Sequence, residues 1–190
     1  MSLEDIKDIV RETISDGFNV IGLLKNISLG QTYYPFDLKT CKFDNGAVLF
    51  NRVNVLISSP NDLQQLKSKN LAFEGADIVS LSFANIDLLE KFLKQTDNAQ
   101  FNLISINPKD YPLSHHLFKL LKTSPFFIEW TYESILSKEN SSVVFENMFK
   151  ILESMHKKII LSSGVSSLLL RRSNKEMVEF IQGVSNDHSE

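Results

Sequence analysis

Residues 48–67 read VLFNRVNVLISSPNDLQQLK, and this stretch decides the fold. Its first part, Val48 to Ser58, is apolar, rich in branched residues and of strand length, so it predicts a β-strand. Ser59 and Pro60 then supply a capping hydroxyl and a proline suited to a first helical turn, so a helix is expected through about Lys67. A strand, a cap and a helix follow one another directly.

The same unit recurs in the middle of the chain. An apolar strand over 76–83 precedes a helix that Asn85 can cap. A second strand, over 101–106, precedes a helix that Ser114 can cap, and a third strand is expected over 126–131. This repeated alternation of strand and helix predicts a parallel sheet buried on both faces.

Further elements are expected on both sides of these units. They are a helix from Leu3 to Gly17, a strand over 18–24, a helix over 142–156, a strand over 158–162 and a helix over 174–181. Residues 26–46 show no clear period and contain several glycine, proline and asparagine residues, so they predict a loop or an abbreviated element.

The length and composition indicate one α/β domain. A chain of 190 residues is short for a complete eight-fold (β/α) barrel, which typically needs about 250, and periodicity leaves barrel and open sheet as alternatives. We expect one domain over 1–184 and a disordered polar tail over 185–190. No apolar run approaches the roughly 18 residues of a membrane span, and the single Cys41 fits a reducing compartment inside the cell.

The average charge does not favour nucleic-acid binding. Lys and Arg number 20 against 23 for Asp and Glu, which gives −3. The segment from His156 to Lys175 nevertheless contains no acid, and a local basic stretch can bind phosphate. Its basic residues are Lys157, Lys158, Arg171, Arg172 and Lys175.

The usual motifs of catalysis and cofactor binding are absent from the sequence. It contains neither GxGxxG nor GxxxxGK[ST], and neither HxH nor HExxH. Adjacent His115 and His116 would point about 100° apart on a helix, which favours a solvated pair over metal ligands. The run Ser162-Ser163-Gly164 does not match GxSxG, but its small side chains would let a phosphate approach the backbone after a strand.

One carboxylate is expected inside an apolar strand. Glu129 lies in the run FFIEWT, where an unpaired charge would be costly, so it needs a basic or hydrogen-bonding partner. Arg52, also inside a strand, is one candidate for that partner. The adjacent Trp130 and Tyr132 could stack on nucleic-acid bases or pack in the core.

Three stretches, in this order, resemble the thirty-kilodalton protein subunit family of ribonuclease P and MRP. They are LFNRVNVLISSPNDLQQL (49–66), IEWTYESIL (128–136) and KKIILSSGVSSLLLRRSNKEMVEFI (157–181). The third stretch, an apolar strand followed by a Ser-Ser-Gly turn, arginines and a helix, is the most specific of the three. The likeness covers residues from about Leu3 to Val184 and is weakest between 26 and 47.

The resemblance implies a TIM-like (β/α) barrel without catalytic residues or a metal site of its own. Such a subunit would bind ribonuclease P RNA, a small partner protein and other protein subunits, and would meet precursor tRNA through the complex. Magnesium would belong to the catalytic RNA. A nuclear or nucleolar location and a part in rRNA processing are expected if the source is a eukaryote. The expected RNA contacts are Lys158, Ser162, Ser163, Gly164, Arg171, Arg172 and Lys175.

This chain departs from the family pattern at both ends. The family's first strand with an Asp-Leu pair and its last strand and helix have no counterpart here, so we expect an incomplete barrel of about six to seven strands. Such a barrel exposes sheet edges, which either a partner or a substitute strand from the middle loop would cover. The family's Arg-Gly-Pro-Tyr run is replaced by Arg171-Arg172-Ser173-Asn174.

Two alternatives belong to other functional classes. One is a barrel enzyme of the metal-dependent phosphoesterase kind, which would need a cluster of His and Asp at strand ends. The other is a pure protein-interaction module that uses its unpaired edges and aromatic strand, and this module would show no salt-sensitive affinity for RNA.

Overall fold

The computed structural model describes most of the chain in several segments. These are residues 3–38, 46–68, 73–95, 101–106, 113–131, 151, 154–155, 158–162, 173, 175–179 and 182.

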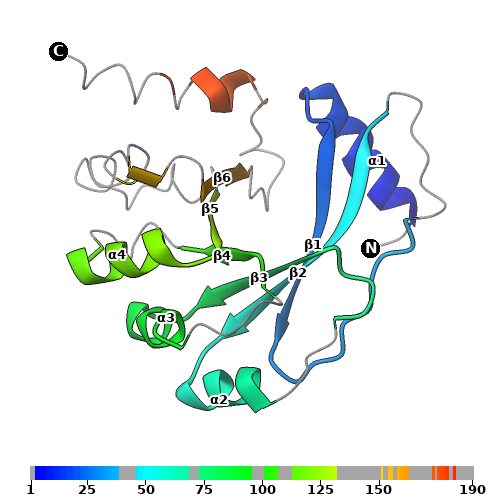
Figure 1. The fold of residues 1–190 in the computed structure, drawn as a ribbon. Helices are drawn as coiled ribbons and strands as arrows, with labels where there is room; N and C mark the ends of the chain where they lie inside the picture. Colours follow the sequence, from blue (N-terminus) through cyan, green and yellow to red (C-terminus); the bar gives the residue numbers. More distant parts are fainter. Residues whose placement is uncertain are drawn as a thin grey trace.

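The described strands form one parallel sheet of six strands in sequence order. They are β1 (Val20–Ser28), β2 (Val48–Ile57), β3 (Ile78–Phe83), β4 (Leu103–Ser105), β5 (Phe127–Thr131) and β6 (Ile159–Ser162). Each strand pairs with the next, and β1 and β6 are the two ends of the sheet. The sheet curls into a half-barrel (Figure 1), which confirms the predicted incomplete TIM-like barrel.

The described helices are α1 (Leu3–Ser15), α2 (Pro60–Ser68), α3 (Ile86–Leu93) and α4 (His115–Thr123). The predicted caps are present at three of them. The Asn85 side chain accepts a hydrogen bond from the Leu88 N–H at 3.1 Å, and Ser114 Oγ accepts one from the Leu117 N–H at 3.1 Å. At α2, Ser59 Oγ accepts from the backbone N–H of Asp62 at 3.3 Å. These short polar signals fix where each helix begins after its strand.

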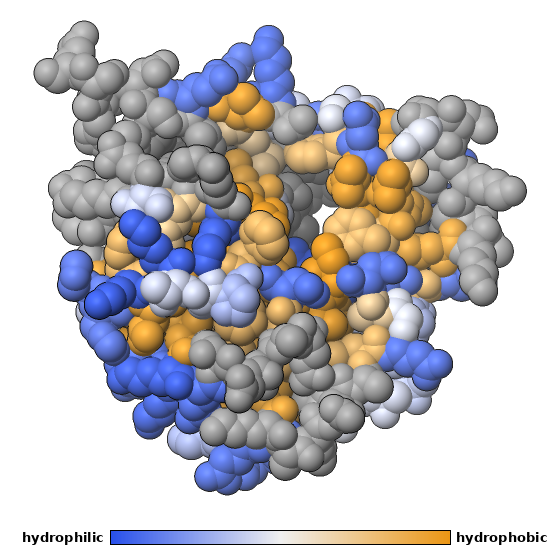
Figure 2. All heavy atoms as spheres, in the orientation of Figure 1, coloured by the Kyte–Doolittle hydropathy of each residue, from blue (hydrophilic) through white to orange (hydrophobic). Residues whose placement is uncertain are grey.

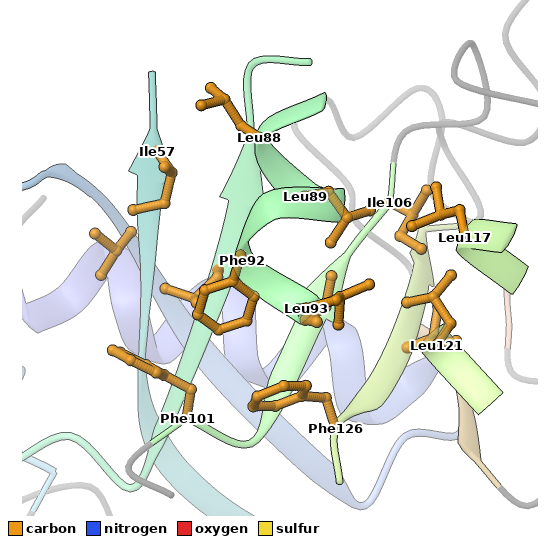
Figure 3. Packing of buried hydrophobic residues seen from close by; sticks show 14 of the residues in the cluster. Ile57, Leu88, Leu89, Phe92, Leu93, Phe101, Ile106, Leu117, Leu121 and Phe126 are labelled. Carbon is orange, nitrogen blue, oxygen red and sulfur yellow. The ribbon is translucent and has the colours of Figure 1, made fainter. Parts of the chain in front are cut away.

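The main core lies between the convex face of the sheet and helices α2, α3 and α4. Helix α3 is at its centre, with Leu88, Leu89, Phe92 and Leu93 directed at the sheet (Figure 3). The Phe92 ring lies 5.3 Å from the Phe126 ring and 6.4 Å from that of Phe101, between centroids, in tilted and edge-on arrangements that aromatic pairs favour. This packing fixes the curvature of the sheet from outside.

A smaller core covers the same convex face at the other end of the sheet. Val10 of α1 packs on Ile21 and Leu23 of β1, and all three are buried. The segment around Phe36, after β1, covers this cluster. The side-chain amide of Asn51 holds it there: Oδ1 accepts from the Phe36 N–H at 2.8 Å and Nδ2 donates to the Phe36 carbonyl at 3.1 Å. Here an irregular segment, together with α1, covers the sheet face that helices alone cover elsewhere in the fold.

Some sequence expectations need correction. Strand β1 continues to Ser28, beyond the predicted limit of Leu24, because β2 offers it a continuous ladder as far as Leu56. In the described part of the middle loop, 29–38 and 46–47, no substitute strand forms. The sheet is buried on its convex face, whereas several concave-face side chains are exposed, so the expectation of burial on both faces is wrong.

Part of the predicted C-terminal half falls outside the described residues. The helix expected over 142–156 is represented by three helical residues, at 151, 154 and 155, and the last helix by 175–179 and 182. The expected tail over 185–190 is not described. Among the described helices, none is both long enough and apolar enough to span a bilayer.

Candidate functional site

The concave face of the half-barrel carries the polar groups of the sheet. Neighbours in a parallel ladder point their side chains to the same face, so the register identifies one row across the sheet. Leu56 is level with Ser82, Ser82 with Ser105, Ser105 with Glu129, and Glu129 with Ile160. The alternate residues, such as Leu81 and Ile104, point to the convex face and are fully buried. The alternation of side chains along each strand therefore places the apolar core on the convex face and the polar groups on the concave face.

An ion pair across this interior joins β2 to β5. Both terminal guanidinium nitrogens of Arg52 donate to the Glu129 carboxylate, Nη1 at 2.5 Å to Oε1 and Nη2 to Oε2. The side chains are 12% and 2% exposed respectively, so the pair is buried. Ser105 Oγ donates to Glu129 Oε2 at 2.5 Å, and Ser162 Oγ donates to Oε1 at 2.7 Å. This confirms the predicted partner of Glu129 and adds hydroxyls from β4 and β6.

The environment keeps Glu129 ionised. Burial raises the pKa of its carboxyl. The hydrogen bonds and charge of Arg52, together with the two serine hydroxyls, lower the pKa by more than burial raises it, so the pKa lies below its ordinary value. A carboxylate with a lowered pKa and four donors is a poor general acid or base at neutral pH. The geometry therefore favours a structural tie between four strands over acid–base chemistry.

A second polar chain runs beside the ion pair. Asn54 Nδ2 donates to Asn26 Oδ1 at 2.9 Å and to Ser82 Oγ at 3.0 Å, which links β1, β2 and β3. Ser80 Oγ donates to Asn54 Oδ1 at 3.2 Å and accepts from Arg52. The two chains thus form one network across the concave face. Alternating serines in the run IVSLSF were the available sequence signal for it.

The predicted RNA contacts Lys158 and Ser162 lie at opposite ends of β6. Lys158 Nζ donates to the carbonyl of Lys122 at 2.9 Å and to that of Ser124, at the C-terminal end of α4. Burial lowers the pKa of Lys158 below its ordinary value. Lys158 immediately precedes β6 and Ser162 is its last residue, so the two side chains are at different ends of that strand.

The other predicted contacts are only partly described. Lys175 is exposed on the last helical segment, and its Nζ lies 3.7 Å from Glu179 Oε1. The predicted contacts Ser163, Gly164, Arg171 and Arg172 lie outside the described residues. The RNA contacts therefore stay a prediction for all seven residues.

Two further expectations are resolved by burial. Trp130 is fully buried in the convex-face core, so it packs there and cannot stack on a nucleic-acid base. His115 and His116 are exposed at the start of α4, where His116 Nε2 lies 3.6 Å from Glu90 Oε1. Tyr132 is not among the described residues.

No three His, Cys, Asp or Glu side chains are grouped as a metal site anywhere in the described segments. Arg52 and Glu129 bond each other, and the Ser105 and Ser162 hydroxyls bond Glu129. The polar groups of the interior thus satisfy one another and tie the strands together. Next to β6 and after it, the basic residues that the structure describes are Lys158 and Lys175.

Comparison with solved structures finds a likeness that covers nearly the whole chain. No family model and no curated protein matches the sequence. A chain of the cryo-EM structure of archaeal ribonuclease P with mature tRNA is similar in structure, with a TM-score of 0.67 and 13% sequence identity. The match covers 94% of this chain and 78% of the other. At this identity the likeness shows the fold, and that fold is the one that the sequence resemblance implied.

Proposed function

We propose that this chain is a non-catalytic protein subunit of ribonuclease P, with MRP as a second candidate particle, and that it supports RNA-catalysed maturation of tRNA 5′ ends. In this role it binds the catalytic RNA and a small partner protein, and meets precursor tRNA through the complex. The RNA and its magnesium ions perform the cleavage. In a eukaryotic source the particle would be nuclear.

The observation that carries this proposal is the likeness of nearly the whole chain to one chain of an archaeal ribonuclease P structure. Three sequence stretches that resemble the family are the independent support. They contain the two residues of the buried ion pair, Arg52 and Glu129, which tie the half-barrel together.

The RNA contacts are proposed on the C-terminal side of β6. Arg171, Arg172 and Lys175 follow that strand in sequence and can place cations against a phosphate backbone, while Ser162, Ser163 and Gly164 allow close approach. Lys158 would have to give up its bonds to two α4 carbonyls to bind phosphate. We therefore expect Lys158 to contribute less than the arginines.

The test is recovery of RNA with the tagged, full-length chain from its native cells at moderate salt. Sequencing should find ribonuclease P RNA or MRP RNA, and mass spectrometry should find a small partner protein. Replacing Arg171 and Arg172 together by Ala should lower RNA recovery about tenfold, because two phosphate contacts are lost.

The matched control is replacement of Lys119 and Lys122 by Ala. Both are exposed on α4, and the change removes the same two charges. RNA recovery with this control should stay within about twofold of the wild type. Absence of both RNAs from the wild-type complex would show that the proposed function is wrong, and equal losses in the two variants would refute the proposed contact site.

A further inference from the structure

The outer edge of β1 has backbone groups without a partner strand. The Val48 N–H donates to the Asn19 carbonyl at 2.8 Å, so the odd-numbered residues of β1 face β2 in this parallel ladder. The N–H and C=O groups of Val20, Gly22, Leu24 and Asn26 therefore point away from the sheet. In the described part of the chain no strand pairs with this edge.

This edge is regular, and no residue of β1 blocks the pairing of a further strand. Its register with β2 is continuous over nine residues, and its odd side chains Ile21 and Leu23 are buried under α1. Natural sheets blunt such edges with proline, bulges or exposed lysine. The one lysine of β1, Lys25, points to the convex face, where its ammonium bonds the Tyr34 carbonyl at 2.5 Å and lies 4.2 Å from the centre of the Phe36 ring.

Exposed apolar side chains accompany the free edge on the concave face. Val20 of β1 is exposed level with the exposed Val48 of β2, and the exposed Leu24 lies further along β1, level with Arg52. Figure 2 shows hydrophobic side chains around a hollow between the α1, β1 and β2 region and the opposite side of the half-barrel. A segment that pairs with β1 would direct every second side chain towards this hollow.

The charge of the concave face favours a polypeptide over RNA. Among the described strand residues on that face, Arg52 and Glu129 carry the only charges, and they neutralise each other. A phosphate backbone would find no unpaired cation there. A neutral, alternately apolar strand would find both hydrogen-bonding groups and apolar surface.

We infer that the β1 edge receives an extended strand of a different protein, with alternate apolar side chains covering Val20, Leu24 and the hollow beside them. A second copy paired through its own β1 would add its own exposed Val20 and Leu24 to the same face and leave the hollow unfilled. The inference rests on the partner-binding part of the proposed function and is independent of the RNA contacts.

Amide hydrogen exchange tests the inference without altering the chain. It compares the free full-length protein with the complex purified from native cells, resolved to single residues. In the free protein the amides of Gly22 and Leu24 should exchange fast, whereas those of Ile21 and Leu23 should be slow. In the complex the even-numbered amides should slow by roughly tenfold or more, because a docked strand accepts their hydrogens.

Variants at one position separate the backbone contribution from the side chain. Leu24→Thr keeps the N–H, whereas Leu24→Pro removes it at a place where no bond to β2 is lost. Leu24→Lys places a charge on the apolar face. Partner recovery should fall several-fold with Lys and more with Pro than with Thr. The control is Ile9→Lys, the same change at a residue of similar exposure on α1, 42% against 45%, and it should retain the partner.

The outcomes distinguish a strand of a different protein from RNA and from a second copy at the β1 edge. Unchanged exchange of the even-numbered amides in the complex overturns the inference, as does protection that disappears after ribonuclease treatment. Protection that grows with the concentration of the free chain indicates a second copy and also overturns it. Ribonuclease P RNA in a complex whose β1 amides exchange freely would leave the proposed function standing and this inference refuted.

Discussion

The two faces of the same six strands have opposite physical roles. On the convex face, Val55, Leu81 and Ile104 are fully buried beneath helices α2 to α4. On the concave face, their sequence neighbours form a polar network around Arg52 and Glu129, flanked by exposed apolar side chains such as Leu24. The outer helices therefore supply the hydrophobic stabilisation, whereas the polar interior holds the strands in register.

The largest expected effect comes from replacing a leucine by alanine on each of the two faces. Leu81→Ala removes a fully buried side chain from the convex-face core and should lower the free energy of unfolding by about 2 to 5 kcal/mol. Leu24→Ala removes a side chain that is 45% exposed on the concave face and should cost under about 1 kcal/mol. Urea unfolding measures both. Similar losses would contradict the assignment of the two faces.

The next test removes the charge at the centre of the interior. Glu129→Gln leaves Arg52 buried without a counter-charge and should cost about 3 kcal/mol of unfolding free energy. Ser105→Ala removes one hydroxyl from the same carboxylate and should cost about 1 kcal/mol. Chemical denaturation of both variants gives the two values. A Glu129→Gln protein as stable as the wild type would show that the interior network does not hold the strands together.

The same carboxylate gives the interior a pH dependence that the convex-face core lacks. The folded pKa of Glu129 lies below its ordinary value, so the unfolded chain binds more protons at acidic pH, and stability falls as pH decreases. The contribution is fully present above the ordinary value of 4.5 and is lost as pH falls through the folded pKa. The difference in stability between wild type and Glu129→Gln should therefore shrink below this pH. Thermal melts across the acid range would contradict this if the difference stayed constant.

The smallest effect concerns close packing at the exposed edge of the concave face. A Cβ atom at Gly22 would lie 2.6 Å from Cζ of Phe50, so Gly22→Ala forces that ring to move. We expect a loss of about 1 kcal/mol, because the partly exposed ring can shift towards the open side. Phe50→Leu should relieve the clash, so the double variant should lose less than the sum of the two single changes. Additive losses in a double-mutant cycle would contradict a direct contact.

Much of the fold was predictable because its signals are local. The strand over 48–58 and the caps at Ser59, Asn85 and Ser114 are close to their observed positions, since capping depends on hydrogen bonds within one turn. The length of β1 was underestimated, because its last residues are held by pairing with β2 rather than by their own apolar character. Nonlocal pairing overrides weak local preference.

The candidate site was predictable in part for the same reason. A carboxylate within an apolar strand requires a partner, and this requirement pointed to Arg52 as one candidate for Glu129. The hydroxyls of Ser105 and Ser162 were not assigned to it, because they reach the carboxylate from neighbouring strands that are 24 and 33 residues away in sequence. The amine of Lys158 bonds the carbonyls of Lys122 and Ser124, a contact between distant segments that the sequence did not predict.

The sequence by itself determined the alternation of strands and helices, the caps, and the need for a counter-charge at Glu129, because these follow from periodicity, local hydrogen bonding and the cost of burying a charge. Tertiary structure alone decided that the sheet remains an open half-barrel over the described residues, that one face is core and the other a polar interior, and that β1 presents a free edge. The physical reason is that face, register and edge depend on which strands pair across the sheet, and pairing between distant segments is not encoded in any one of them.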